Sequence, residues 1–308
     1  NTRRYEIERI MWKLRPADFD SVVRPLYSLA TEIYENVSSV LINEALAASN
    51  FDFSSSILPL VMDKVALGFH INTELRKHVT GAREATLVVF SGIKIDKLDD
   101  LENIIDRGKL RMIISAGSVA MALKKAQAQL DGGDFHIGLA QEDENAMSYI
   151  STKRIEQAKR IIRKCNNSEI NVVLPIDFVL DDGTVSGEIP ENRLQFDIGP
   201  KTRVLFSLKL DEFANSGENL AMFYNGVFGK FEDERFANGT KAFIGELRSL
   251  TERGVRTYVG GGEGRMALLK YGKLEDVTHA FNAGGTILKS LGNKHIAYLK
   301  AGYLSNAT

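Results

Sequence analysis

Residues 258–269 read YVGGGEGRMALL, a short apolar run followed by four glycines within five residues and then by a run of helical character. Glycine loses more conformational freedom on folding than any other residue, so a cluster of glycines indicates backbone that needs positive φ or a close approach. The stretch therefore predicts a β-strand, a tight turn and a helix. A phosphate held at the helix N-terminus would explain the turn, and so would a tight turn without a ligand. The stretch alone leaves both interpretations open.

The same order of strand, turn and helix recurs from residue 84 onward. Short apolar runs rich in β-branched and aromatic residues predict strands at 85–90, 110–115, 170–180, 219–225 and 256–261. Helical patterns lie at 96–108, 118–130, 151–165, 234–254 and 264–272. This alternation predicts an α/β fold whose parallel sheet is covered by helices on both faces. Glycines follow several strands, so we expect several turns to line the sheet edge at which such folds bind ligands.

The N-terminal part has a different pattern. Residues 1 to about 48 carry apolar residues at three- and four-residue spacing, which predicts helical structure. Pro25 interrupts that pattern and is expected to separate two helices. The composition of SNFDFSSS (49–56) predicts a loop, and 67–79 predicts a further helix.

Composition restricts the class of protein. The chain has 308 residues, 44% of them hydrophobic and 26% charged, which is typical of a soluble globular protein of about two domains or one large α/β domain. A net charge of −1 gives no support for a nucleic-acid or membrane partner, and no apolar run is long enough to cross a bilayer. The N-terminus shows no apolar signal region. The single cysteine, Cys165, excludes an internal disulfide and predicts an intracellular, reducing compartment.

Common ligand motifs are missing from the sequence. There is no Gly-x4-Gly-Lys-Ser/Thr loop, and no Gly-x-Gly-x-x-Gly follows the first strand of the α/β part. The five histidines show no metal-binding spacing with Cys165, which argues against a zinc site. Cys165 itself lies in a basic helical run and reads as a bystander rather than a nucleophile.

Charged and amide side chains follow three of the predicted strands. Lys94 and Lys97 could neutralise a polyphosphate, or lie in a solvated loop. Asn225 and Glu232 flank a turn that could present an amide and backbone N–H groups to an anion, or simply turn the chain. Glu263 could hold a divalent metal on a phosphate, or favour the helix dipole as an acid in the first turn. The shared location of these residues at strand ends favours the ligand-binding interpretation.

Several motifs in register resemble the phosphoglycerate kinase family, over roughly residues 30 to 303. YNGVFGKFEDERFANGT resembles the segment of that family that reads Trp-Asn-Gly-Pro-x-Gly-x-Phe-Glu and then Phe-Ala-x-Gly-Thr. FDIGPKT (196–202) contains its Asp-Ile-Gly-Pro-Lys-Thr motif, and YVGGGEGRM and THAFNAGGTILKSL fall in the same order and spacing. SGIKIDK parallels Gly-Gly-Ala-Lys-Val-x-Asp-Lys with one residue missing, and VLINEAL and LGFHINTEL resemble two N-terminal motifs of the family.

The resemblance implies a two-domain architecture: an N-terminal domain that binds 3-phosphoglycerate, a C-terminal domain that binds nucleotide, and closure about a hinge. On this basis we expect a reduced, mainly helical N-terminal domain at 1–66, an interdomain helix at 67–80, a nucleotide-type α/β domain at 81–290, and a tail at 291–308 that returns towards the N-terminal domain.

The resemblance also implies roles for individual residues. Lys94 and Lys97 would face phosphates, Asn225 the phosphoryl group and Glu232 the ribose, while Glu263 would replace the metal-binding Asp of the family. The implied cofactor is Mg-ADP or Mg-ATP.

The glycines have implied roles as well. The turn Gly260, Gly261 and Gly262 would hold phosphate at a helix start, and Gly117 is the glycine that remains on the adenine side. Gly284 and Gly285 belong to the last phosphate turn and, with Lys94, are the candidate catalytic residues.

Specific departures from the family pattern favour a loss of activity. Phe51, Asp52 and Phe53 occupy the positions of an Arg-Ala-His segment that the family places against the substrate phosphate. Ala283 replaces the first glycine of the last phosphate turn, and Gly264 replaces a threonine after the metal-binding acid. Transition-state stabilisation needs the whole set of donors at once.

Three functional hypotheses follow. The first is a catalytically inactive relative, retained as a structural or partner-binding subunit among other protein subunits, with residual adenine-nucleotide binding. The alternative is an active phosphoglycerate kinase or related phosphotransferase that moves phosphoryl between ATP/ADP and a carboxylate such as 3-phosphoglycerate. The third is a nucleotide-sensing module.

Overall fold

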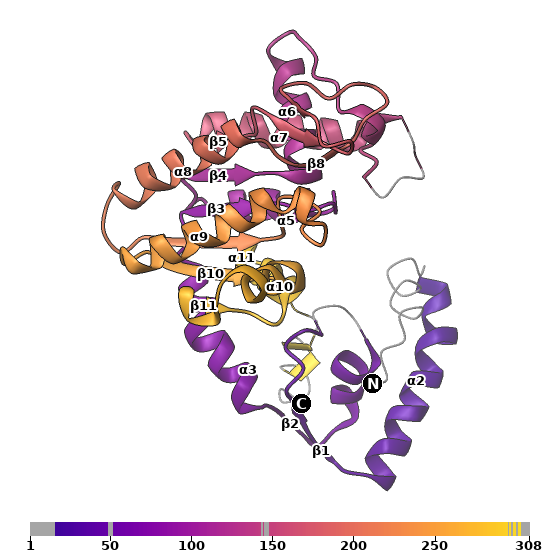
Figure 1. Ribbon diagram of the computed structural model, residues 1–308. Helices are drawn as coiled ribbons and strands as arrows, with labels where there is room; N and C mark the ends of the chain where they lie inside the picture. The colour runs from indigo at the N-terminus through magenta and orange to yellow at the C-terminus, as the bar shows by residue number, and fades with distance from the viewer. Residues whose placement is uncertain are drawn as a thin grey trace. The chain divides into compact units, whose positions relative to one another are not determined.

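The computed structural model describes residues 16–48, 52–142, 144, 148–294, 296, 298–299 and 301–302. The chain divides into two compact units (Figure 1). The larger unit comprises residues 81–284, and the smaller unit comprises the described residues up to 80 together with those from 285. None of the helices within the described ranges is long and apolar enough to span a membrane.

A six-stranded parallel sheet forms the centre of the larger unit. Its strands, in the spatial order β11-β10-β9-β3-β4-β5, are β11 (His279–Ala280), β10 (Arg256–Gly260), β9 (Ala221–Asn225), β3 (Leu87–Phe90), β4 (Met112–Ser115) and β5 (Asn171–Val173). The chain builds outward from β3 to β5 on one side, then crosses back and builds outward from β9 to β11 on the other. The strand order therefore reverses between β3 and β9, and such a reversal opens a crevice at the carboxyl ends of the two strands.

Helices bury the sheet, as the alternating sequence pattern predicts. They are α5 (Lys97–Asp106), α6 (Gly117–Leu130), α7 (Thr152–Asn167), α8 (Pro200–Ala214), α9 (Asn238–Glu252) and α10 (Gly262–Tyr271). The core on one face joins Val89, Ile114 and Met222 of the sheet to residues of α8, α9 and α10, such as Phe243. Because successive strand residues alternate in direction, Val88 turns to the opposite face, where it is also fully buried. The predicted α/β class with a helix-covered parallel sheet is confirmed.

Cys165 lies on α7 and is fully buried. Burial raises the pKa of its thiol to about 11, so the thiol stays protonated near neutral pH. A buried thiol in this state does not act as a nucleophile.

The expectation of one strand over 170–180 is wrong. β5 ends at Val173, and Pro175, which has no N–H to donate to a ladder, separates it from β6 (Phe178–Leu180). β6 pairs antiparallel with β7 (Val185–Ser186) and with β8 (Gln195–Ile198) in a separate small sheet. Short helical turns complete the larger unit, at η4 (Gly138–Gln141), η5 (Glu234–Phe236) and η6 (Leu274–Asp276).

The smaller unit combines one long helix with a two-stranded parallel sheet. Its elements are α2 (Pro16–Asn36), β1 (Val40–Asn43), the turns η1 (Phe53–Ile57) and η2 (Leu58–Val61), β2 (Lys64–Leu67), α3 (Phe69–Thr73) and η3 (Glu74–Val79). α4 (Thr80–Ala82) and α11 (Gly284–Leu291) lie at the boundaries of the two units. The core packs Leu26 and Ala30 of α2 against Phe53, Ile57 and Leu58.

Three expectations for this part are corrected by the structure. α2 continues through Pro25, which is exposed, because the buried face of the helix packs on the core and offsets the hydrogen bond that proline removes. Residues 40–43 form β1 rather than helix, paired with β2. Residues 53–57 form a helical turn rather than a loop, because the buried carboxylate of Asp52 accepts the Ser55 N–H at its start. The helical prediction for residues 1–15 lies outside the described residues.

Candidate functional site

The candidate site lies at the carboxyl ends of β3, β9 and β10, where the strand order reverses. The loop that follows β3 carries Ser91, Gly92 and Lys94 and leads to Lys97 at the start of α5. The last residue of β9 is Asn225. These residues are far apart in the sequence and are brought together because β3 and β9 are hydrogen-bonded neighbours.

Lys97 is a buried cation in this crevice. Its side chain is 9% exposed, and its Nζ donates to the Ser91 carbonyl oxygen at 2.5 Å. Burial lowers the pKa of Lys97, the Glu263 carboxylate opposes that effect, and the neighbouring charge of Lys94 lowers the pKa further. The ammonium has three N–H donors, so an incoming anion could take those that Ser91 does not use.

The side chain of Glu263, on α10, lies near the same backbone as Lys97, at Gly92. A methyl group placed on Gly92 would lie 3.0 Å from Lys97 Nζ and 3.4 Å from Glu263 Oε2, so both charged groups border the backbone of Gly92. Glu263 stands in the first turn of α10, where the helix dipole favours a negative charge. Lys97 and Glu263 thus border the same stretch of backbone, and the charge of exposed Lys94 acts on Lys97.

Asn225 fixes the glycine turn after β10. Its side chain is buried, and Nδ2 donates to the Gly260 carbonyl oxygen at 2.8 Å. Gly261 has φ +92°, and a methyl group on it would lie 2.9 Å from Asn225 Nδ2. Gly262 begins α10 and has open space where a side chain would be. The turn therefore needs glycine for its conformation and leaves the start of the helix accessible.

The strand-end loops approach one another as backbones. A methyl group on Gly226 (φ +110°) would lie 2.0 Å from the Ser91 carbonyl oxygen, and one on Gly117 (φ +62°) would lie 2.6 Å from the Gly92 oxygen. The Ser118 N–H, at the start of α6, donates to that same Gly92 oxygen at 3.0 Å. The loops after β3 and β9 and the start of α6 therefore pack against one another through peptide backbone.

The remaining candidates are placed less centrally. Gly284 packs on the glycine turn, since a methyl group on it would lie 2.7 Å from Gly261 Cα. Gly285 is exposed and belongs to the smaller unit. Lys94 and Glu232 are both exposed, and within the described ranges no hydrogen bond or ion pair ties Glu232 to the cluster. The roles inferred for all of these residues remain predictions.

Two residues that connect the elements around the site, Ser91 and Asp197, were not predicted from the sequence. The Ser91 hydroxyl donates to the Val227 carbonyl oxygen at 2.5 Å and joins the loop after β3 to the loop after β9. Asp197, fully buried at the end of β8, accepts the Gly239 N–H at 2.8 Å and its own neighbour Ile198 N–H at 2.8 Å. The motif FDIGPKT marks Asp197 in the sequence, but only the structure shows that it holds the start of α9.

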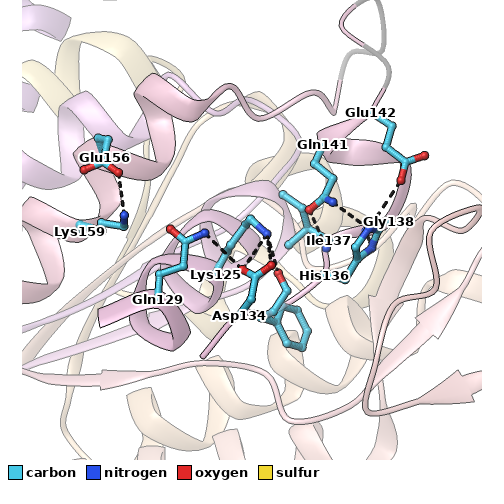
Figure 2. Close-up of polar contacts among 11 residues, drawn as sticks. Lys125, Gln129, Asp134, His136, Ile137, Gly138, Gln141, Glu142, Glu156 and Lys159 are labelled. Carbon is cyan, nitrogen blue, oxygen red and sulfur yellow. Dashed lines mark hydrogen bonds and ion pairs between the residues drawn. The ribbon is translucent and has the colours of Figure 1, made fainter. Parts of the chain in front are cut away.

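A second polar cluster secures the loop after α6 (Figure 2). Lys125 Nζ donates to the Asp134 carboxylate at 2.9 and 3.0 Å, and to the Phe135 carbonyl oxygen at 3.1 Å. His136 Nδ1 accepts the Gly138 N–H at 3.0 Å, and its Nε2 lies 2.7 Å from Gln141 Nε2. The same His136 Nε2 lies 3.5 Å from Glu142 Oε1. These contacts explain the shape of the loop and need no ligand.

Fold and site together define a parallel α/β protein with charged side chains and glycine turns at its topological switch point. The family model described as phosphoglycerate kinase matches residues 1–294, and the chain belongs to that family. The family resemblance inferred from the sequence motifs is therefore confirmed.

Named relatives agree with this assignment. Phosphoglycerate kinase from Candida albicans is 27% identical over 275 residues, which cover 85% of this chain and 61% of that protein. Phosphoglycerate kinase from Chloroherpeton thalassium is 30% identical over 292 residues, which cover 88% of this chain and 66% of that protein. The structure of phosphoglycerate kinase from Coxiella burnetii has the same fold, with a TM-score of 0.70 at 23% identity, and the match covers 90% of this chain and 68% of that one. The chain thus spans about three fifths of the length of its first curated relatives.

Proposed function

We propose that the larger unit binds the polyphosphate of an adenine nucleotide with magnesium, and that the protein is a phosphotransferase of the phosphoglycerate kinase type. The observation that carries the proposal is the convergence of Lys97, Glu263 and the glycine turn at the reversal between β3 and β9.

The crevice suits a polyphosphate in charge and in shape. Lys97 and Lys94 supply positive charge, and the start of the ten-residue helix α10 supplies N–H groups and the positive end of a dipole. Open space beside Gly262 would let a phosphate approach the start of α10 closely, because no side chain intervenes there. Phosphoryl transfer depends mainly on this kind of positioning and charge neutralisation.

The residues present also fit a magnesium ion. Mg²⁺ in phosphate sites is commonly held by one or two carboxylates together with phosphate oxygens and water. Glu263 offers such a carboxylate next to the two lysines, and bound magnesium would neutralise charge on the phosphates. The residues of this chain would position the phosphates through Lys97 and would fix the glycine turn through Asn225.

The acceptor is proposed from the names of the relatives. The curated relatives are named phosphoglycerate kinase, which indicates a carboxylate such as 3-phosphoglycerate as phosphoryl acceptor. For this chain the acceptor depends on the family assignment and not on a described side chain.

Calorimetric titration with Mg-ADP, followed by a coupled assay with 3-phosphoglycerate, tests the proposal. Saturable binding that weakens in the Lys97→Met variant and turnover in the assay are the expected results. Lys109→Met is the matched control, because Lys109 pairs with Glu84 away from the crevice. Absence of Mg-ADP binding to the wild-type chain would contradict the proposal.

The second candidate is a catalytically inactive subunit that binds protein partners. Asp52, at one of the positions where the family resemblance implies an Arg-Ala-His segment, is 4% exposed and accepts hydrogen bonds from the Ser54 and Ser55 hydroxyl groups. This position therefore carries a carboxylate, which repels a phosphorylated acid. Mg-ADP binding without turnover would support this candidate over the kinase.

A further inference from the structure

The smaller unit contains a cavity of about 390 Å³ that is separate from the nucleotide-type crevice. Its walls are β1 with the turn that follows it (residues 41–45) and, from η1 and η2, Ser54, Ser55 and Leu58. We call it the β1–η1 cavity. Its volume lies in the range of pockets that hold small molecules.

The hydroxyl groups on the wall are arranged to accept hydrogen bonds. Ser54 Oγ donates to Asp52 Oδ1 at 3.1 Å, and Ser55 Oγ donates to the same oxygen at 2.8 Å. Each hydroxyl group has one proton, so both retain only lone pairs for a ligand. Donor-rich ligands therefore match this wall better than ligands that carry only acceptors.

The charge of the wall is negative. Glu44 lines the cavity, and its two carboxylate oxygens accept the backbone N–H groups of His70 and Ile71 at 3.2 Å each. Asp52 lies directly behind the serines and is 4% exposed. Within the described ranges, no basic side chain forms an ion pair with either carboxylate. Asp52 is a buried carboxylate without a cation, which is costly, and Glu44 adds an exposed negative charge to the wall, so a cationic ligand would be favoured.

The rest of the wall is apolar. Leu41, Ile42 and Leu58 line the cavity, and Leu58 is buried in the core of the smaller unit. A short aliphatic group would remove these side chains from water, which is favourable by roughly 25 cal/mol per Å² of apolar surface.

We propose that the β1–η1 cavity binds a small primary ammonium compound with a short aliphatic stem. The ammonium group donates to the serine hydroxyl oxygens and to Glu44, and the stem contacts Leu41 and Ile42. A phosphate ester has the wrong charge for this wall, so the ligand of the cavity is distinct from the carboxylate acceptor considered above.

Titration of the full chain with n-butylammonium chloride, followed by NMR chemical shifts, tests the inference. We expect saturable shifts in the millimolar range that include residues 41–45, and no saturable shifts there with n-butanol or inorganic phosphate. Glu44→Gln should weaken butylammonium binding about tenfold, because it removes the negative charge while keeping the size of the side chain. Glu35→Gln is the matched control, an exposed carboxylate on α2 of the same unit.

Two results would overturn the inference: equal binding of butylammonium and butanol, or saturable binding of phosphate in the cavity. Ser54→Val provides a second variant if Glu44→Gln fails to fold, and it should also weaken binding because it removes an acceptor. Mg-ADP affinity, measured on the same samples, reports on the larger unit, so failure here is distinguishable from failure of the proposed function.

Discussion

Lys97 places an ammonium group where folding alone does not favour it. The group is 9% exposed, and burial together with Lys94 lowers its pKa. A buried cation of this kind is retained at a cost to stability, which is understandable if an anionic ligand recovers the cost on binding.

Substitution of Lys97 by Met separates these two effects. Without nucleotide, the melting temperature of Lys97→Met should equal or exceed that of the wild type, because a desolvated charge is removed. With Mg-ADP, the affinity should fall at least tenfold, about 1.4 kcal/mol, because a charge-assisted contact is lost. Differential scanning fluorimetry with and without Mg-ADP measures both. A lower melting temperature with full Mg-ADP affinity would show that Lys97 is structural.

Substitution of Gly117 and of Gly108 by alanine separates the cost of close backbone packing from the cost of positive φ. Both have positive φ, +62° and +74°, but a methyl group on Gly117 would lie 2.6 Å from the Gly92 oxygen, whereas nothing lies within 4 Å of one on Gly108. Gly108→Ala should cost about 1 kcal/mol of unfolding free energy through φ alone. Gly117→Ala should cost clearly more, and urea denaturation measures the difference. Equal losses would mean that the loop after β3 moves aside freely.

Sequence reasoning found the side chains that follow strands, and missed those that link one strand end to another. Lys97, Asn225 and Glu263 were found because each follows a recognisable apolar run. Ser91 was missed because its hydroxyl group acts on Val227, which lies far along the chain. Such a link depends on the order of strands in the sheet, which the sequence does not display.

At the scale of elements, the contact between β8 and α9 makes stability depend on pH. Burial raises the pKa of Asp197 to about 7, against an ordinary value near 3.9, although the Gly239 and Ile198 N–H groups oppose the shift. An acid whose pKa is raised by folding binds its proton more tightly in the folded state. The resulting stability is present below the unfolded pKa and is lost as pH rises through about 7.

The free energy of unfolding should therefore fall between about pH 4 and pH 7, by at most about 1.4 kcal/mol per pH unit from this group. Asp197→Asn should flatten that slope, and urea unfolding at several pH values measures it. Asp131→Asn, an exposed change of the same kind at the end of α6, should leave the slope unchanged. If the slope persists in Asp197→Asn, another group is responsible.

Helices and strands with a regular spacing of apolar residues were predictable from the sequence, and those that depend on tertiary packing were not. The helices α5, α6 and α7 and the strands β3 and β9 follow apolar patterns in the sequence. The prediction of helix at Val40–Asn43 was wrong because these residues continue the helical spacing of α2, and only pairing with β2 makes them a strand. The prediction that Pro25 separates two helices was also wrong. Packing of α2 on the core outweighs the local preference against proline inside a helix.

For the molecule as a whole, the single thiol reports on global opening. Cys165 is fully buried and its pKa is about 11, so alkylation requires an opening of the fold. Mg-ADP at one hundred times its dissociation constant should slow labelling about 100-fold, because it stabilises the native state by about 2.7 kcal/mol. Labelling followed by mass spectrometry measures the rates. An unchanged rate would mean that α7 opens locally without loss of the nucleotide site.

Family and fold class were predictable for the whole molecule because several motifs agree in order. The internal packing of the smaller unit was less predictable. The sequence showed that Phe51, Asp52 and Phe53 stand in place of an Arg-Ala-His segment, but the cavity beside Asp52 depends on how β1 and η1 pack. Cavities arise from three-dimensional packing and leave no periodic signal in a sequence.

The reversal of strand order also has a consequence for synthesis. As the chain leaves the ribosome, β3, β4 and β5 can pair with one another, but the other neighbour of β3 begins only at Ala221. At about 5–20 residues per second this delay is on the order of ten seconds. Throughout it, the apolar edge of β3 has no partner strand and is open to other nascent chains. Chaperone dependence in vivo should therefore concentrate in this window, and codons that speed translation between residues 90 and 221 should raise the soluble yield.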